Sequence, residues 1–354
     1  MKAMVLTGHG GLDKYVWHED WPRPEPSPME ALIRVGACGL NNTDVNTRSG
    51  WYSKTVSEAT TGGAYASVAD DDPTWGGAPI TFPRIQGADA VGEVVAVGEG
   101  ADPALIGKRV MTNGWCRDWS DPENMKKAKY FGSEVDGGFA EYTKTDIRDM
   151  AVVTSDLSDA ELATFSCSYS TAEGMLSRAQ VTAQDTVLVP GASGGVGGAL
   201  VQLAKLRGAR VIAMASDAKH GDVSRLGPDR ILPRAPDDLR AALGDENVTV
   251  VADVVGGPYW PMLIDILERG GRYTCSGAIA GPMVTLDLRT LYLRDLTFTG
   301  STVIPLHVFG DLVSYIERGD IQPVLAATYP LRDLREAQQA FIDKRHVGNI
   351  VVIP

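Results

Sequence analysis

The pattern of apolar and polar positions changes near residue 155 and predicts a β-rich first part followed by an α/β second part. In the first part, short apolar runs lie between turns rich in Gly and Pro, which is typical of strands. They occupy 3–6, 31–35, 85–100, 108–111 and 137–142. After Ser158, apolar positions follow helical spacing and then alternate between helices and short buried strands. These later strands are predicted at 187–189, 211–215, 248–255, 272–276 and 296–300, and the chain closes with a helix over 334–342 and a strand over 350–353.

Residues 186–216 form the clearest local unit, a strand, a glycine-rich turn, a helix and a second strand. Backbone N–H groups at a helix start, together with the positive end of the helix dipole, suit a pyrophosphate. A glycine motif alone is weak evidence, but with a strand on each side of the turn and helix it predicts dinucleotide binding. The candidate cofactor-binding residues in this turn are Gly191, Ser193, Gly194, Gly195, Val196 and Gly197. The alternative is a glycine-rich connection in another doubly wound sheet.

Composition narrows the class of protein. The chain has 354 residues, enough for two domains with sizeable cores. Its net charge of −12 argues against nucleic acid as a partner. Four scattered cysteines without a CxxC pair indicate a reduced, cytoplasmic setting. No apolar run approaches the roughly 20 residues of a membrane span, so we expect no membrane association.

Several motifs, taken together, resemble the medium-chain dehydrogenase/reductase superfamily, and within it the zinc-independent quinone oxidoreductase-like branch. They keep the family's order over nearly the whole chain, apart from an insert at 53–80. The motifs are MKAMVL at the start, 39–41, 47–52, 87–92 with 97–98, 136–142, 171–172, GASGGVG at 191–197 and 346–348.

The resemblance implies an α/β fold with two domains and an active site in the cleft between them. A GroES-like β-rich catalytic domain would occupy 1–155, and a Rossmann-type doubly wound parallel sheet would occupy 156–305. The segment 306–354 would return to the catalytic domain. Family members commonly form homodimers through the Rossmann domain, and Leu296–Val303 would be the matching edge strand. We expect the insert, with Tyr65 and Trp75, to border the pocket.

The zinc ligands of the related alcohol dehydrogenases are mostly missing. Asn41 and Ala88 stand where that family has cysteine and histidine, and only Cys167 matches a ligand-type residue. The region of the structural zinc lobe offers only Cys116. A catalytic zinc needs three protein ligands, so we expect no metal.

The end of the second strand of the dinucleotide unit favours NADPH over NADH. NAD-binding units usually carry an acidic residue there, but this chain has Ala215 followed by Ser216. A hydroxyl at Ser216 and the ammonium of Lys219 suit a 2′-phosphate, and similar NADPH-dependent relatives carry serine and lysine here. Asp217 leaves NADH open, because a shift of one residue would aim its carboxylate at the ribose. The alternative role for Lys219 is that of a solvated lysine at a helix end.

Without a metal, hydride would pass directly to an electrophilic carbon, and side-chain donors would stabilise and protonate the oxyanion that results. The candidate catalytic residues are Tyr52, Asn41 and Thr43. Tyr52 occupies a position where similar quinone and enoyl reductases carry a tyrosine, although it is alternatively a packing aromatic. Thr43 matches the hydroxyl that touches the alcohol oxygen in zinc-dependent relatives.

The resemblance implies further cofactor contacts. Thr171 matches a residue packed against the nicotinamide, and Val255 follows a strand at the ribose. Ser276 and Gly277 follow the next strand on the nicotinamide side. Arg345 resembles a phosphate-neutralising arginine of the quinone reductase branch, and is alternatively a surface residue.

The leading hypothesis is an NADPH-dependent, metal-free reductase that acts on a quinone or an α,β-unsaturated carbonyl compound. A second is an alcohol dehydrogenase or carbonyl reductase that acts on a small alcohol or aldehyde without zinc. A third, from another class, is a regulatory protein that binds NADPH with little catalysis. In each enzyme hypothesis the substrate is a small molecule.

Overall fold

The computed structural model describes residues 1–65, 68 and 79–354, so Trp75 and the other residues of the insert between 66 and 78, Val68 excepted, lie outside the described residues. The chain divides into two compact units. The first unit comprises Met1–Val56, Thr61–Cys167 and Phe309–Pro354, and the second comprises Ser57–Thr60 and Ser168–Val308.

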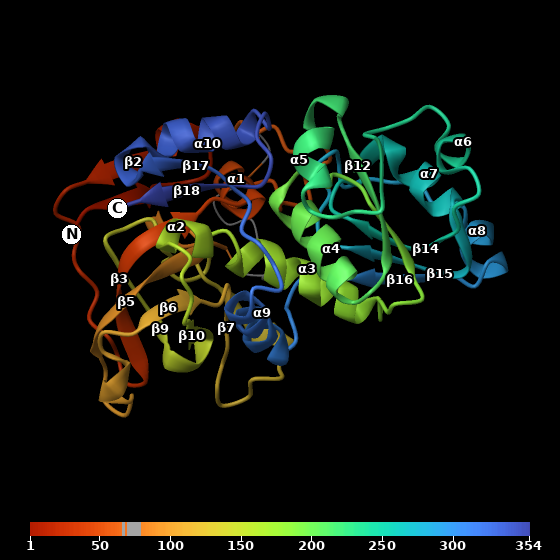
Figure 1. The fold of residues 1–354 in the computed structure, drawn as a ribbon. Helices are drawn as coiled ribbons and strands as arrows, with labels where there is room; N and C mark the ends of the chain where they lie inside the picture. The colour runs from red at the N-terminus through yellow and green to blue at the C-terminus, as the bar shows by residue number, and fades with distance from the viewer. Residues whose placement is uncertain (66–67, 69–78) are drawn as a thin grey trace. The chain divides into compact units, whose positions relative to one another are not determined.

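The first unit is built on a seven-stranded sheet with the order β10-β6-β5-β3-β18-β17, in which β9 also pairs with β3. The bounds are β3 (Glu30–Gly39), β5 (Asp89–Val97), β6 (Arg109–Thr112), β9 (Tyr142–Asp146), β10 (Met150–Val152), β17 (Leu325–Pro330) and β18 (Asn349–Ile353). The chain's last strand, β18, pairs antiparallel with β3, with Val351 opposite Gly39. Strands from opposite ends of the chain therefore lie side by side, red beside blue in Figure 1.

Smaller elements complete the first unit. Two further sheets have the orders β2-β1-β4 and β7-β8. Their strands are β1 (Ala3–Leu6), β2 (Tyr15–His18), β4 (Arg84–Ile85), β7 (Trp115–Cys116) and β8 (Lys129–Tyr130), and the helices are α1 (Asn42–Ser49), α2 (Asp159–Leu162) and α10 (Leu334–Ile342). Because α2 packs against β3 and β5, the first unit extends past residue 155, where the sequence pattern changes.

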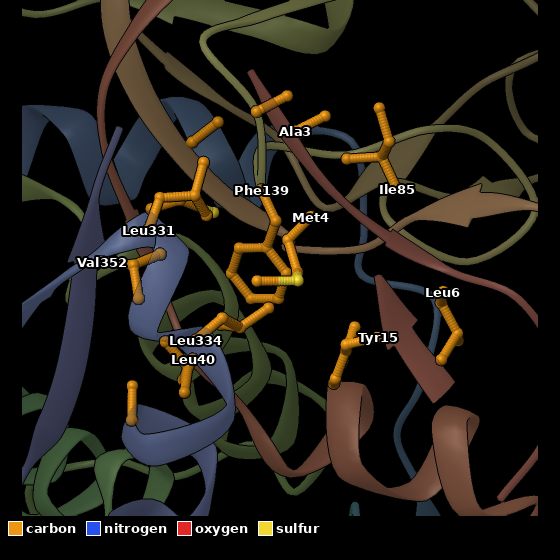
Figure 2. Close-up of a cluster of buried hydrophobic side chains, with 14 of the residues drawn as sticks. Ala3, Met4, Leu6, Tyr15, Leu40, Ile85, Phe139, Leu331, Leu334 and Val352 are labelled. Carbon is orange, nitrogen blue, oxygen red and sulfur yellow. The ribbon is translucent and has the colours of Figure 1, made fainter. Parts of the chain in front are cut away.

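A buried apolar cluster joins the distant segments of the first unit (Figure 2). Met4 from β1, Phe139 and Leu334 from α10 are each at most 1% exposed. Leu40 belongs to the same cluster and directly precedes Asn41, the N-cap of α1. The core thus fixes the point at which the chain leaves β3 and enters the helix that carries candidate site residues.

The second unit contains a six-stranded sheet with the order β13-β12-β11-β14-β15-β16, and every pairing in it is parallel. The strands are β11 (Thr186–Val189), β12 (Arg210–Ala215), β13 (Arg230–Pro233), β14 (Val248–Asp253), β15 (Leu267–Cys275) and β16 (Thr297–Gly300). Numbered within the unit, this order is the 3-2-1-4-5-6 arrangement of dinucleotide-binding sheets. The expected fold class, a β-rich domain together with a doubly wound parallel sheet, is therefore confirmed.

Helices alternate with these strands: α4 (Gly195–Leu206), α5 (His220–Ser224), α6 (Leu239–Leu243), α7 (Trp260–Asp265) and α8 (Leu288–Leu293). Two more, α3 (Ser166–Arg178) and α9 (His307–Arg318), each cross a boundary between the units. Among the described residues, no helix combines the length and the apolar character needed to span a bilayer.

Candidate active site

The first candidate residue, Asn41, stands between β3 and α1 and forms the N-cap of that helix. Its backbone N–H donates to Asp44 Oδ2 over 2.7 Å. The other oxygen of the Asp44 carboxylate accepts from the Gly87 backbone N–H over 3.3 Å. A carboxylate in the first turn of a helix satisfies a free backbone donor and interacts favourably with the helix dipole. Asp44 therefore holds the start of α1 against the segment that leads into β5.

Asp89, at the start of β5, connects Asn41 to the start of α3. Its Oδ2 accepts from Asn41 Nδ2 over 3.0 Å, and its Oδ1 accepts from the Cys167 backbone N–H over 2.6 Å. The side chain is 1% exposed. Burial raises the pKa of Asp89 to about 7, against the opposing effect of these two hydrogen bonds. It also raises the pKa of Asp44 to about 7, and the neighbouring Asp89 carboxylate adds to that rise. The site thus contains two buried carboxyl groups that flank Asn41.

Tyr52 follows α1 and lies among polar groups of the same unit. Burial raises the pKa of its phenol, and the side chains of Thr43 and Asn46 partly oppose that effect. Thr43 Oγ1 is buried and makes no hydrogen bond of standard geometry within the described residues. The phenol is protonated at neutral pH because its pKa lies above the ordinary value. The structure therefore brings Tyr52 and Thr43 into one neighbourhood as hydroxyl donors.

Cys167 is partly exposed, and its thiol accepts a hydrogen bond from Tyr130 Oη over 3.1 Å. The sequence analysis did not identify Tyr130, because it lies on the two-residue strand β8, far along the chain from the other site residues. The thiol also contributes to the raised pKa of Tyr52. Cys167, Tyr130 and Tyr52 consequently belong to the same polar cluster.

The donor set of this cluster does not fit a catalytic zinc ion. At the three ligand positions, the Asn41 amide bonds to Asp89, Ala88 has no ligand atom, and only Cys167 offers a soft ligand. In the part of the chain that the structure describes, no three His, Cys, Asp or Glu side chains are grouped so that they could hold a metal. The expected absence of zinc stays a prediction.

In the second unit, the turn between β11 and α4 forms a backbone cradle. Gly191 has a φ of 67°, and Gly194 is the N-cap of α4. A Cβ atom on Gly197 would lie 2.2 Å from the Gly191 carbonyl oxygen, so the helix approaches the turn more closely than a side chain allows. The first N–H groups of a helix have no partner within that helix, and Gly195, Val196 and Gly197 begin α4. The residues present fit a dinucleotide pyrophosphate, as the sequence predicts.

The end of β12 presents a hydroxyl and two cations. Ala215 ends the strand and pairs with Pro233 of β13, so Ser216 and Arg234 follow at neighbouring strand ends. Burial lowers the pKa of Lys219, and the nearby charge of Arg234 lowers it further. Two like charges held together suit an anion between them. Arg234 was not among the predicted site residues because β13 (Arg230–Pro233) was not predicted. Its position directly after a strand end is the signal that would identify it.

Asp217, which kept NADH open, has an exposed side chain. Its side chain is 89% exposed and its carboxylate lies 3.6 Å from His220 Nε2. The residue that directly follows β12 is the neutral Ser216. The groups that could bind a 2′-phosphate here are the Ser216 hydroxyl and the cationic side chains of Lys219 and Arg234.

The ends of β14 and β15 lie beside each other, because Asp253 pairs with Cys275. The buried Asp253 carboxylate accepts from the Val255 backbone N–H over 2.7 Å and from Tyr273 Oη over 2.9 Å. Burial raises its pKa. Ser276 Oγ donates to the Ser301 carbonyl oxygen over 2.6 Å. These bonds hold the turns that carry Val255, Ser276 and Gly277 at the same edge of the sheet as the glycine turn.

The remaining two predicted residues are carried by other segments of the chain. Thr171 lies on α3, within the part of that helix that belongs to the second unit. Arg345 is exposed and lies between α10 and β18 of the first unit. The structure groups Gly191 to Gly197, Ser216, Lys219, Val255, Ser276 and Gly277 along one sheet edge of the second unit, and it groups Asn41, Thr43 and Tyr52 in the first.

Two protein families match the chain. The alcohol dehydrogenase GroES-like domain matches residues 27–155, and the zinc-binding dehydrogenase family matches residues 195–318. A solved structure of a candidate alcohol dehydrogenase from Sinorhizobium meliloti 1021 is 45% identical, with a TM-score of 0.90, and the match covers 100% of this chain and 96% of that one.

Two curated relatives are more distant. Acryloyl-coenzyme A reductase of Metallosphaera sedula is 26% identical over 362 residues, which cover 99% of each chain. Quinone oxidoreductase of Rattus norvegicus is 25% identical over 352 residues, which cover 97% of this chain and 94% of the relative. These relatives act on different acceptors, so the comparisons support an oxidoreductase without specifying its substrate.

Proposed function

Because this chain belongs to the medium-chain dehydrogenase/reductase superfamily, we propose that it is an NADPH-dependent, metal-free reductase of quinones or α,β-unsaturated carbonyl compounds. The observation that carries the proposal is the cluster of Asn41, Thr43 and Tyr52, which places neutral hydrogen-bond donors where zinc-dependent enzymes have a metal centre. Both a quinone oxidoreductase and an acryloyl-coenzyme A reductase are among the relatives. In both named acceptors, a carbonyl group is conjugated to a carbon–carbon double bond.

The chemistry divides between the two units. NADPH, when bound, would supply a hydride to the carbon β to the carbonyl, which would leave negative charge on the carbonyl oxygen. In the first unit, Thr43 and Asn41 donate to that oxygen, and this stabilises charge as it develops. Tyr52 keeps its proton on Oη at neutral pH because burial raises its pKa. It is therefore a donor that can protonate the enolate.

The preference for NADPH rests on the groups at the end of β12. An acidic residue there would repel a 2′-phosphate, whereas Ser216 donates a hydrogen bond and Lys219 and Arg234 supply positive charge. The molecule has a net charge of −12, so local cations are needed to attract an anionic cofactor. Val255, Ser276 and Gly277 would contact the other end of the dinucleotide, with Thr171 against the nicotinamide, and Arg345 would neutralise phosphate charge.

A second candidate function is a zinc-free alcohol dehydrogenase or carbonyl reductase. It is favoured by Thr43, which matches the alcohol-binding hydroxyl of zinc-dependent relatives, and by the 45% identity to the candidate alcohol dehydrogenase. The third hypothesis, a regulatory protein that binds NADPH, predicts cofactor binding without turnover of any acceptor.

We also propose that the protein is a cytoplasmic homodimer formed through the second unit. β16 is the terminal strand of the parallel sheet, and it lies within the expected Leu296–Val303 segment. The neighbouring α8 exposes Leu288, Tyr292 and Leu293, at 65%, 62% and 56% respectively. Exposed apolar side chains beside a sheet edge are typical of an interface. Analytical ultracentrifugation tests this proposal, and a monomer at micromolar concentration would contradict it.

One screen tests the proposed function. Purified protein is mixed with NADPH or NADH and with quinones, enones, enoyl thioesters, aldehydes and alcohols, and oxidation of the cofactor is followed by absorbance. We expect turnover of quinones or enones with NADPH. Turnover of aldehydes and alcohols alone would support the second candidate function. Cofactor binding without turnover of any compound would support the regulatory protein.

A further inference from the structure

The Asp89 side chain bonds to two of the positions where the related zinc enzymes hold their metal. Its carboxylate accepts from the Asn41 side chain over 3.0 Å and from the Cys167 backbone N–H over 2.6 Å. Asp89 itself directly follows Ala88, the third of those positions. A single side chain thus connects the start of β5, the N-cap of α1 and the first turn of α3.

Burial of the Asp89 carboxylate lowers the stability of the folded protein unless both hydrogen bonds form. Asp89 is 1% exposed, and a buried carboxylate loses its hydration, which only well-placed donors offset. The positive end of the α3 dipole adds a further favourable interaction. A buried, perturbed carboxyl group inside a cluster of candidate catalytic residues is a common mark of a functional site.

The hydrogen bond also determines which atom of the Asn41 amide faces the carboxylate. Both oxygens of Asp89 act as acceptors, Oδ2 from Asn41 and Oδ1 from the Cys167 backbone N–H, so the amide presents its donor atom Nδ2 to Asp89. The backbone of Asn41 is held independently, because its N–H donates to Asp44 over 2.7 Å. With both its backbone and its Nδ2 atom held, the Asn41 side chain has one orientation.

We propose that Asp89 is a positioning residue for the reduction, and that its carboxylate does for Asn41 and the start of α3 what a metal ion does in zinc-dependent relatives. It holds the Asn41 amide in a fixed orientation beside the carbonyl oxygen of the acceptor. This inference rests on the proposed function and adds the residue that prepares the site for it.

The substitution Asp89→Asn tests the proposal, because it keeps the size of the side chain but replaces one of its two acceptor oxygens with an NH₂ donor, so that only one of the two hydrogen bonds can form. Loss of a residue that orients another typically costs about 10- to 100-fold in activity. We expect kcat for the best acceptor to fall by that factor, while the KM for NADPH, which depends on the second unit, stays within about twofold. An unchanged kcat would overturn the proposal.

A double-mutant cycle separates positioning from general stability. If Asp89 acts through Asn41, the double variant with Asn41→Ala and Asp89→Asn loses no more activity than Asn41→Ala alone. Asp149→Asn is the matched control. Asp149 is 2% exposed and also accepts from a backbone N–H, that of Arg117 over 3.1 Å, but it lies outside the polar cluster. We expect it to leave kcat unchanged. Additive losses in the cycle would contradict the proposal.

A spectroscopic measurement keeps this inference separate from the proposed function. In protein labelled with ¹⁵N at asparagine, the Asn41 Nδ2 resonances are identified by their absence in Asn41→Ala. We expect Asp89→Asn to shift them and to accelerate their exchange with solvent, and Asp149→Asn to leave them in place. Unmoved resonances in Asp89→Asn would overturn the positioning role. If they move while no acceptor is reduced by the wild-type protein, the proposed function fails and the hydrogen bond from Asn41 to Asp89 stands.

Discussion

A Cβ atom on Gly197 would lie 2.2 Å from the carbonyl oxygen of Gly191. The first turn of α4 therefore packs directly against the backbone of the turn that precedes it. The same close approach keeps side chains out of the region where the pyrophosphate would bind. One glycine thus serves both the packing of the helix and access to the cofactor.

Gly197→Ala should weaken both folding and cofactor binding. The added methyl group meets backbone rather than a flexible side chain, and overpacking of this kind costs about 1–3 kcal/mol. Denaturant unfolding and titration with NADPH measure the two effects. Gly221→Ala is the control, because its Cβ would meet nothing within 4 Å and alanine favours the helical backbone of α5. Equal stability of the two variants would contradict the prediction.

Tyr52→Phe should lower kcat and leave cofactor binding intact. Removing a general acid typically costs roughly 100-fold or more in rate, whereas the dinucleotide is bound by the second unit. Steady-state kinetics with the best acceptor and NADPH give the comparison. Tyr142→Phe serves as the control, since that ring packs beneath Arg23, 4.3 Å from its guanidinium carbon. Unchanged turnover in Tyr52→Phe would make the residue a wall of the pocket rather than a donor.

Lys219→Ala and Arg234→Ala should each reduce the preference for NADPH. A hydrogen bond to a charged group contributes about 1.5–3 kcal/mol, so each change should lower kcat/KM for NADPH by about 10-fold or more. The kcat/KM for NADH should not fall, because NADH has no 2′-phosphate. Arg225→Ala is the control, as its guanidinium is 80% exposed and pairs with Asp222 over 3.0 Å. A parallel loss with both cofactors would contradict the assignment.

The stability of the first unit should depend on pH through Asp149. Burial raises the pKa of this carboxyl from 3.8 to about 7. Between these values the folded protein binds a proton that the unfolded chain releases, so the contribution of Asp149 to stability falls as pH rises. The slope is about 1.4 kcal/mol per pH unit at most. Denaturant unfolding from pH 4 to pH 7 should show the wild-type protein losing stability relative to Asp149→Asn. A constant difference between the two proteins would refute this.

Removal of metal should leave activity unchanged. Because Cys167 is the only soft ligand at the three ligand positions, we expect less than stoichiometric zinc in protein purified without added metal. Dialysis against a chelator should not alter turnover or the melting temperature. Stoichiometric zinc, or loss of activity that zinc restores, would require a different donor set from the one proposed.

Local sequence was sufficient to predict several elements. β1 (Ala3–Leu6) and α10 (Leu334–Ile342) have the predicted bounds, and the unit at 186–216 forms the predicted strand, turn, helix and strand. In these segments the apolar period and the glycine turn act over only a few neighbouring residues. The prediction missed β13 (Arg230–Pro233), which is short, ends in proline and lies at the edge of its sheet. Nothing local distinguishes such a strand from a loop.

The sequence by itself determined the chemical types available to this protein. It supplies a glycine-rich turn at Gly191–Gly197 that suits a phosphate, and a neutral Ser216 after the second strand. It also places Asn41 and Ala88 at positions where zinc-dependent relatives have metal ligands. Only the tertiary structure decided which distant groups meet. Pairing of β12 with β13 brings Arg234 beside Ser216, and Asp89 bonds to both Asn41 and Cys167 because β5, α1 and α3 converge. These contacts depend on strand register and on burial between segments far apart along the chain, which no short stretch of sequence encodes.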